Sequence, residues 1–216
     1  MEIELQYLYR SEDALLVPAE LARFVLAESL SFEIVDSFFD AHDLSLRLAG
    51  SSVRVRRQSN LPRPILTWKG PSEIRSDGAR QRQEVEVPID HVPTTGDELV
   101  DALRRYSLWE TILEQSGLEG DLELEPIGKI QNRRTTHLFV QGLHRLEMAW
   151  DRVSYPVGPM EVRLEVEAKR QAAARYLGEV DGQLRSMYGK TLVPAPHGKA
   201  KEMCTRLYPD VFRRPR

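Results

Sequence analysis

The chain is poor in cysteine, in long apolar runs and in excess charge of either sign. Cys204 is the only cysteine, so no intrachain disulfide can form. This cysteine content is consistent with a reducing compartment. No run approaches the ~18 apolar residues of a membrane span, and no apolar leader precedes the charged start of the chain. A net charge of −3 argues against a general nucleic-acid binder. We therefore expect a soluble cytoplasmic protein, monomeric or homodimeric, that binds neither membranes nor nucleic acid.

Signatures of several common enzyme classes are also missing. The five histidines show no metal-ligand spacing, which argues against a zinc site. No G-x-S-x-G elbow of a serine hydrolase is present. The stretch "YGKT" at 188–191 is similar to the end of a phosphate-binding loop, but Leu184 stands where that motif needs its first glycine. Gly189 is better explained as the C-cap of a helix.

Period-two alternation of apolar and polar residues runs through most of the chain and predicts β-strands. The segments 52–58 and 63–70 form a hairpin pattern joined through "SNLP". Helical spacing is confined to a few segments, and 70–79 has the composition of a loop that gates a site. Strands are expected at 2–9, 31–40, 52–58, 63–70, 80–89, 128–140, 143–155 and 160–168, and helices at 18–30, 94–117 with a break near Ser107, 171–189 and 197–208. We expect one mainly antiparallel β domain with flanking helices over residues 1–216.

The charges on these strands gather on one face and, strand by strand, share one sign. Glu2 and Glu4 lie on the same side of their strand, since successive side chains alternate between faces. The pairs Arg54–Arg56 and Glu84–Glu86 behave in the same way. An open sheet with one wet face is one explanation. The other is a closed barrel with a charged lumen and apolar residues outside.

Like charges in a row repel each other unless something of opposite sign lies between them. Carboxylate pairs are natural ligands for a hard cation such as Mg²⁺, whereas arginine and lysine rows bind phosphate oxygens. A lumen that contains both kinds of row is suited to a metal-bound polyphosphate.

At these residues the sequence resembles the CYTH superfamily, the triphosphate tunnel metalloenzymes, which include class IV adenylyl cyclases and thiamine triphosphatases. "EIELQ" resembles the family's E-x-E-x-K signature, "VRVRR" its R-x-R strand and "LTWKG" its lysine strand. The further matches, in order, are "RQEVEV", "NRRTTH", "WDRVSYPVGPMEVRLEVE" and "GKAKE". The resemblance covers nearly the whole chain and implies an eight-stranded antiparallel barrel with helices outside.

The resemblance also implies roles for individual residues. Those implied to be catalytic are Glu2, Glu4, Lys69 and Arg134. Those implied to bind substrate phosphates are Arg54, Arg56, Lys69, Arg133 or Arg134, and Lys199 or Lys201. We add Arg82, which shares a strand face with Glu84 and Glu86, and Arg163, which departs from the family pattern but carries a positive charge. Those implied to hold Mg²⁺ or Mn²⁺ are Glu2, Glu4, Glu84, Glu86, Asp151, Glu161 and Glu165. Only one of Arg133 and Arg134 can face inward on a regular strand.

The implied activity is metal-dependent hydrolysis of a triphosphate, either inorganic tripolyphosphate or a small organic one such as thiamine triphosphate. Cyclisation of ATP to cyclic AMP is one alternative, and binding of polyphosphate or a nucleotide with little turnover is another. Two departures bear on this choice. Gln6 stands where the family has a lysine, which removes a positive charge near the phosphates, and Arg163 stands where the family often has a second glutamate.

Overall fold

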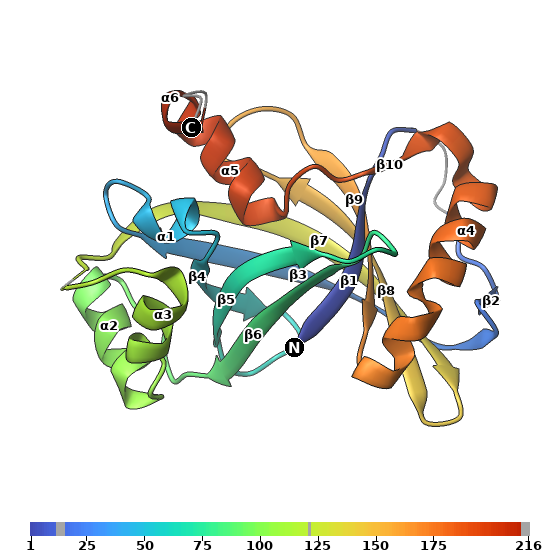
Figure 1. Cartoon of the computed structure of the whole chain (residues 1–216), viewed down its shortest axis with the longest axis horizontal. Coiled ribbons are helices and arrows are strands. Elements are labelled where there is room, and N and C mark those ends of the chain that lie inside the picture. Colours follow the sequence, from blue (N-terminus) through green and yellow to red (C-terminus); the bar gives the residue numbers. More distant parts are fainter. Residues whose placement is uncertain (12–15, 121, 213–216) are drawn as a thin grey trace.

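The structure is a computed structural model that describes residues 1–11, 16–120 and 122–212. One antiparallel sheet forms the body of the molecule (Figure 1). Its strands are β1 (Glu2–Tyr9), β2 (Glu20–Leu21), β3 (Phe24–Asp40), β4 (Ser52–Gln58), β5 (Ile65–Ile74), β6 (Arg80–Pro88), β7 (Glu125–Gln141), β8 (His144–Ser154), β9 (Glu161–Ala168) and β10 (Leu192–Pro194).

Strand β1 closes the sheet into a barrel. Its first residues pair with β6, where Glu2 lies opposite Arg82, and the stretch from Glu4 to Tyr9 pairs with β9. The circular order is therefore β1-β6-β5-β4-β3-β7-β8-β9, which gives eight strands. The expected closed antiparallel barrel is confirmed. Closure leaves an inside and an outside, and alternate residues of each strand face one or the other.

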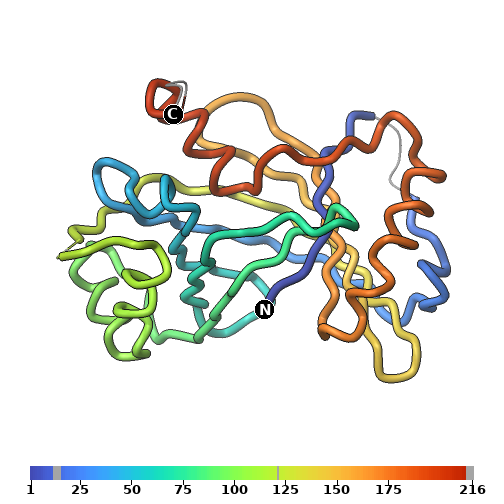
Figure 2. The backbone as a smooth tube through the Cα atoms, viewed as in Figure 1, coloured from blue at the N-terminus to red at the C-terminus, as the bar shows by residue number. Residues whose placement is uncertain are grey.

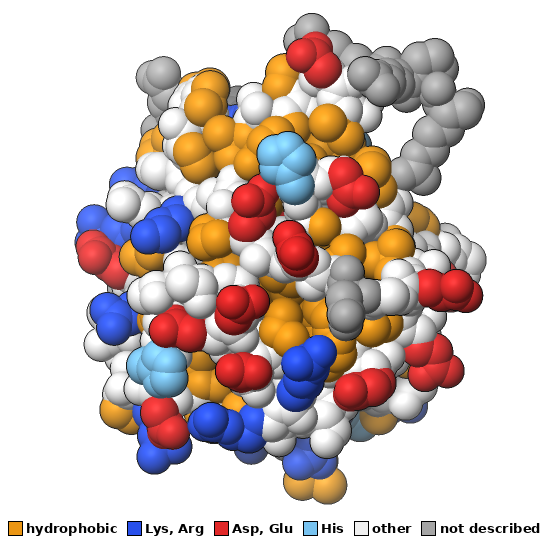
Figure 3. All heavy atoms as spheres, turned by 90° about the vertical axis from the view of Figure 1, so that its left-hand side faces the viewer, with side chains coloured by type: hydrophobic (Ala, Val, Ile, Leu, Met, Phe, Trp, Pro, Cys, Tyr) orange, Lys and Arg blue, Asp and Glu red, His pale blue; other side chains and the backbone are white. Residues whose placement is uncertain are grey.

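Two groups of helices cover the apolar outside. The 3₁₀ helix η1 (Gln171–Tyr176) and helix α4 (Leu177–Tyr188) pack on β1, β8 and β9. Helices α2 (Gly96–Arg105) and α3 (Trp109–Ser116) pack on β4 and β5, where Trp68 is fully buried. The outer surface on this side carries scattered charges of both signs rather than one continuous patch (Figure 3).

The boundaries of α2 and α3 follow from local chemistry. The Thr95 side chain accepts a hydrogen bond from the backbone N–H of Glu98, as expected of an N-cap. Ser107, with φ of 55°, adopts a left-handed conformation between the two helices. The predicted break near Ser107 is therefore confirmed.

Helix α5 (Lys199–Leu207) covers the upper opening of the barrel, with α1 (Ser45–Leu48) and α6 (Pro209–Phe212) beside it (Figure 1). A segment crosses from one side of the barrel to the other between α4 and α5 (Figure 2). It contains the short η2 (Gly189–Thr191) and β10. Met203 and Cys204 pack against Phe38 and Ile130 of the strands. A Cβ on Gly128 would lie 2.8 Å from the Met203 sulfur, so glycine there allows the close approach.

Two expectations for local structure are wrong. Residues 18–30 are not a helix, because Leu21 and Phe24 pair as β2 and β3 across a tight turn at Ala22 and Arg23, both with positive φ. The first half of the segment 70–79 is strand rather than loop, since β5 extends to Ile74, and only residues 75–79 form the turn before β6. Within the described residues, no helix is both long and apolar enough to cross a membrane.

Candidate active site

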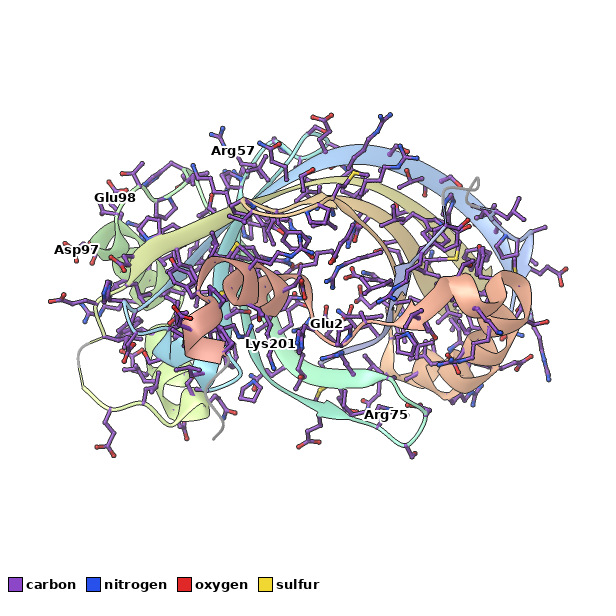
Figure 4. The ribbon with its side chains drawn as sticks, turned by 90° about the horizontal axis from the view of Figure 1, so that it is seen from above. Glu2, Arg57, Arg75, Asp97, Glu98 and Lys201 are labelled. Atoms are coloured by element: carbon purple, nitrogen blue, oxygen red, sulfur yellow. The ribbon has the colours of Figure 1, made fainter. Side chains whose placement is uncertain are left out.

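A cavity of about 1240 Å³ occupies the barrel interior. Typical small-molecule pockets measure roughly 300–1,000 Å³, so this one has room for more than a triphosphate. Every strand of the closed barrel contributes to its wall, together with α5 and the segment before it. Figure 4 shows Glu2 inside the ring of strands, whereas Arg57, Asp97 and Glu98 lie outside.

Strands β1, β5 and β6 form the first charged cluster. The Lys69 Nζ donates to Glu2 Oε1 at 2.6 Å and lies 2.9 Å from Glu84 Oε1. The Arg82 guanidinium donates to Glu2 Oε2 at 2.5 Å and to Glu4 Oε1 at 2.9 Å. The row of glutamates on β1 is therefore balanced by cations on the neighbouring strands, as its repulsion requires.

The two glutamates of β1 differ in how readily they ionise. Burial opposes ionisation of Glu2, but Lys69 and Arg82 outweigh it and hold the pKa well below the ordinary value. For Glu4, burial together with the negative charge of Glu2 raises the pKa to about 8. The positive charge of Arg82, which Glu4 shares with Glu2, offsets only part of this effect.

A second cluster links β3 and β4. Asp36 accepts hydrogen bonds from Arg56 Nε at 2.7 Å, from Arg56 Nη2 at 2.8 Å and from Arg54 Nη1 at 3.3 Å. Asp36 is buried, yet the two arginines outweigh that burial and hold the pKa of the carboxyl far below its usual range. The bidentate contact fixes Arg56, while Arg54 reaches further into the cavity toward Glu84 and Glu86.

A third cluster joins β7, β8, β9 and α5. Arg134 donates to both carboxylate oxygens of the fully buried Asp151, at 2.7 and 2.6 Å, and to Glu165 at 2.5 Å. Lys199 lies 2.7 Å from Asp151 and 2.5 Å from Glu165. These cations outweigh the effect of burial and lower the pKa of both carboxyls. Asp151 therefore anchors two cations whose other contacts face the cavity.

Two guanidinium groups on the cavity wall retain buried donors without acceptors. Arg54 Nε and Arg47 Nε make no hydrogen bond within the part of the chain that the structure describes. A buried donor left unsatisfied costs roughly 1–3 kcal/mol. Such donors in a cavity wall are suited to an anionic ligand that supplies the acceptors.

Most of the predicted site residues lie on this cavity. Those in its lining are Glu2, Glu4, Arg54, Arg56, Lys69, Arg82, Glu84, Glu86, Arg134, Glu165, Lys199 and Lys201, and Gln6 lies among them. Asp151 lies directly behind Arg134. Arg133 is exposed on the outside, so Arg134 is the inward member of that pair.

The expectation that Glu161 and Arg163 face the lumen is wrong. By alternation along β9 both side chains belong to the inward-facing set, but α5 and the segment before it cover them. Arg163 donates to Glu161 at 2.9 Å and to the carbonyl of His197 at 2.8 Å. Glu161 also accepts from Arg206 of α5. These residues bind α5 to the barrel instead of facing the cavity.

Further polar residues of the site were not predicted, among them Arg80, Asp36 and Arg47. Arg80 has the same parity as Arg82 on β6, so alternation could have identified it. Asp36 lies among apolar residues between Glu33 and Asp40, and nothing in the local pattern distinguishes it from them. Arg47 comes from α1, whose position over the cavity no local pattern indicates.

Glu2, Glu4 and Glu165 are carboxylates of the cavity wall that could hold a divalent cation. The charges of Glu2 and Glu165 both raise the pKa of Glu4, so the three lie close enough to repel. Oxygen donors of this kind suit Mg²⁺ or Mn²⁺. In the described residues their oxygens are engaged by lysine and arginine, and no three acidic, histidine or cysteine side chains gather around one point. The donor set fits such a cation once the basic groups turn away from these oxygens.

The family model of the CYTH domain matches residues 1–186. The chain belongs to the CYTH family. No curated protein matches the sequence significantly. Among solved structures, this CYTH protein is similar to HpAC1 from Hippeastrum, an adenylyl cyclase candidate described as having a dominant triphosphatase activity. The two share 20% identity, with 95% of this chain and 96% of the other covered and a TM-score of 0.63.

Two further structures share the fold. PH1819 from Pyrococcus horikoshii is 17% identical, with 94% and 98% of the two chains covered and a TM-score of 0.55. An adenylate cyclase candidate from Vibrio parahaemolyticus is 17% identical, with 94% and 97% covered and a TM-score of 0.55. At these identities the likeness concerns the fold alone.

Proposed function

We propose that this protein is a metal-dependent hydrolase of triphosphates, acting on inorganic tripolyphosphate or on a small organic triphosphate inside the barrel. The observation that carries the proposal is that Arg54 and Arg47, in the wall of a cavity rich in lysine and arginine, each keep a buried Nε donor without an acceptor among the described residues. Membership of the CYTH family and the triphosphatase activity described for HpAC1 support it.

The basic residues would bind and orient the phosphates. Arg54, Lys69 and Arg82 come from three adjacent strands and converge on one side of the cavity, while Arg134 and Lys199 face them from the other. Guanidinium and ammonium groups so arranged stabilise the charge that spreads over phosphoryl oxygens during transfer. Asp36 and Asp151 hold Arg56 and Arg134 in place, which limits reorganisation when the substrate binds.

Glu2, Glu4 and Glu165 would hold Mg²⁺ or Mn²⁺. A bound divalent cation supplies Lewis-acid neutralisation of phosphoryl oxygens. With both cation and substrate bound, Lys69 and Arg82 would contact the phosphates in place of Glu2 and Glu4, whose oxygens would then be available as ligands of the cation.

Cyclisation of ATP is the second candidate. It is favoured by a cavity of about 1240 Å³, which exceeds what a bare triphosphate fills, and by the adenylate cyclase names of structural neighbours. Binding with little turnover is the third, and it is motivated by Gln6 in place of the family lysine.

A phosphate-release screen separates the three. Tripolyphosphate, thiamine triphosphate and ATP are incubated with the protein and either Mg²⁺ or Mn²⁺, and cyclic AMP is measured in the ATP samples. The proposal predicts cation-dependent orthophosphate from at least one triphosphate. Cyclic AMP without orthophosphate would favour the cyclase. The absence of both products would favour binding without turnover.

A further inference from the structure

Gln6 belongs to the cavity lining and carries a buried acceptor that a phosphate cannot satisfy. Its Nε2 donates to Glu4 Oε1 at 2.8 Å. Its Oε1 is buried and has no hydrogen-bond partner among the residues that the structure describes. Phosphate oxygens are acceptors as well, so they do not complement this atom. It differs in this respect from the unpaired donors of Arg54 and Arg47.

The surroundings of Gln6 are rich in oxygen. Gln6 lies directly opposite Glu165 in the register of β1 and β9 and two residues from Glu4 on the same face. The nearest cations are already shared between carboxylates, with Arg82 on Glu4 and Lys199 on Glu165. The unpaired amide oxygen therefore adds one more oxygen donor to a group of carboxylates that lysine and arginine side chains neutralise only by sharing.

The orientation of the amide follows from its neighbours. If the amide were flipped, its oxygen would face the Glu4 carboxylate, and two acceptors would repel. The bond to Glu4 therefore assigns Nε2 to that side and leaves Oε1 on the other. Gly198 of the crossing segment has no side chain there, and even a Cβ at that residue would stay 3.8 Å from Oε1.

We propose that Gln6 Oε1 is a ligand of the divalent cation held by Glu2, Glu4 and Glu165, and that the cation binds before any phosphate. Amide oxygens are normal ligands of hard cations. A lysine at this position places a positive charge where the cation binds. Binding of the cation then depends on the phosphates. The inference rests on the proposed function, but it concerns the order of binding and a residue that departs from the family pattern.

The test measures Mn²⁺ binding to the apo protein without phosphate, by the loss of the electron paramagnetic resonance signal of free Mn²⁺. The variants are Gln6→Met, which removes the oxygen, Gln6→Lys, which adds a positive charge, and Gln6→Glu, which keeps an oxygen. Gln58→Met is the matched control, because Gln58 lines the same cavity from β4. Circular dichroism establishes that each variant is folded.

We expect Gln6→Met to weaken Mn²⁺ binding about tenfold or more, Gln6→Lys to weaken it further, and Gln6→Glu to bind at least as tightly as the wild type. Gln58→Met should bind like the wild type. Equal affinities of wild type and Gln6→Met overturn the inference, as does a wild type that binds Mn²⁺ only with phosphate. If Gln6→Met does not fold, equal affinities of Gln6→Lys and Gln6→Glu overturn it. Phosphate release by the wild type tests the proposed hydrolase separately, so the two can fail independently.

Discussion

The inner and outer walls of the barrel consist of alternate residues of the same strands, yet different forces hold them together. On β7, Arg134 faces inward and binds Asp151 and Glu165, whereas Arg133, one residue away, is exposed. Outside, Trp68 and Leu99 are fully buried between strand and helix. The same backbone thus supports an ionic interior and an apolar exterior. Whether a residue occupies an odd or an even position along its strand decides which wall it belongs to.

The two walls have opposite effects on stability. Removing charged groups from water is costly, and their mutual attraction offsets that cost only where the geometry is good. Burial of large apolar side chains contributes about 1.5–3 kcal/mol each. The apolar exterior therefore stabilises an interior whose charges are arranged for a ligand rather than for stability. Four substitutions test this division.

The largest effect is expected for Arg134→Gln. The substitution removes a cation from the cavity and leaves the buried Asp151 with Lys199 as its remaining charged partner. We expect kcat/KM for the best triphosphate to fall about 100-fold or more and the protein to lose roughly 3 kcal/mol of stability. Steady-state kinetics below the melting temperature of the variant, with urea unfolding alongside, measure both. Activity within a few fold of the wild type would remove Arg134 from the site.

The next largest effect is expected for Glu4→Gln, measured with and without a divalent cation. Activity should fall about tenfold to 100-fold, since a cation ligand is lost. The apo protein should respond in the opposite direction. The pKa of Glu4 is raised from 4.5 to about 8, so its contribution to stability is present at low pH and is lost as the pH rises through that window.

Thermal unfolding in EDTA at a series of pH values tests the sign. The wild type should become less stable toward pH 8 by an amount that Glu4→Gln does not show, and near pH 8 the variant should be the more stable protein. A Glu4→Gln variant that is less stable than the wild type at that pH would show that Glu4 is satisfied without a cation.

A smaller effect on stability alone is expected for Glu161→Gln. This carboxylate accepts from Arg163, which is 1% exposed, and from Arg206 of α5. Loss of its charge should cost roughly 1–3 kcal/mol, and kcat should change little because Glu161 lies outside the cavity. Parallel melts and kinetics measure the two effects, and a loss of cation-dependent activity without a loss of stability would return Glu161 to the ligand set.

The smallest effect is expected for Arg133→Gln, the control for Arg134→Gln. Exposed substitutions away from special features usually change stability by less than about 0.5 kcal/mol, and the outer wall of β7 does not face the substrate. The same kinetics and urea unfolding are used. A large loss of activity would mean that the inside and the outside of β7 have been exchanged.

The sequence was sufficient for most of the eight barrel strands and most of their inward-facing charges because both follow from a period of two. Gln6, Glu84 and Lys69 lie on the cavity as alternation required. Glu161 and Arg163 failed because parity predicts the direction of a side chain but not the element that covers it, here α5. The helix expected at 18–30 failed because its apolar spacing also fits a hairpin, and Ala22 and Arg23 form the turn without glycine or asparagine.

The central claim is that the lumen binds and cleaves triphosphates, and ³¹P nuclear magnetic resonance tests it most directly. Tripolyphosphate is incubated with the wild type and Mg²⁺, and its signals are followed over time against Arg134→Gln. The account predicts conversion to diphosphate and orthophosphate by the wild type and little conversion by the variant. The account would be contradicted if folded wild type left the spectra of tripolyphosphate, thiamine triphosphate and ATP unchanged with Mg²⁺ and with Mn²⁺. In the Mn²⁺ samples the paramagnetic cation is removed before the spectra are recorded.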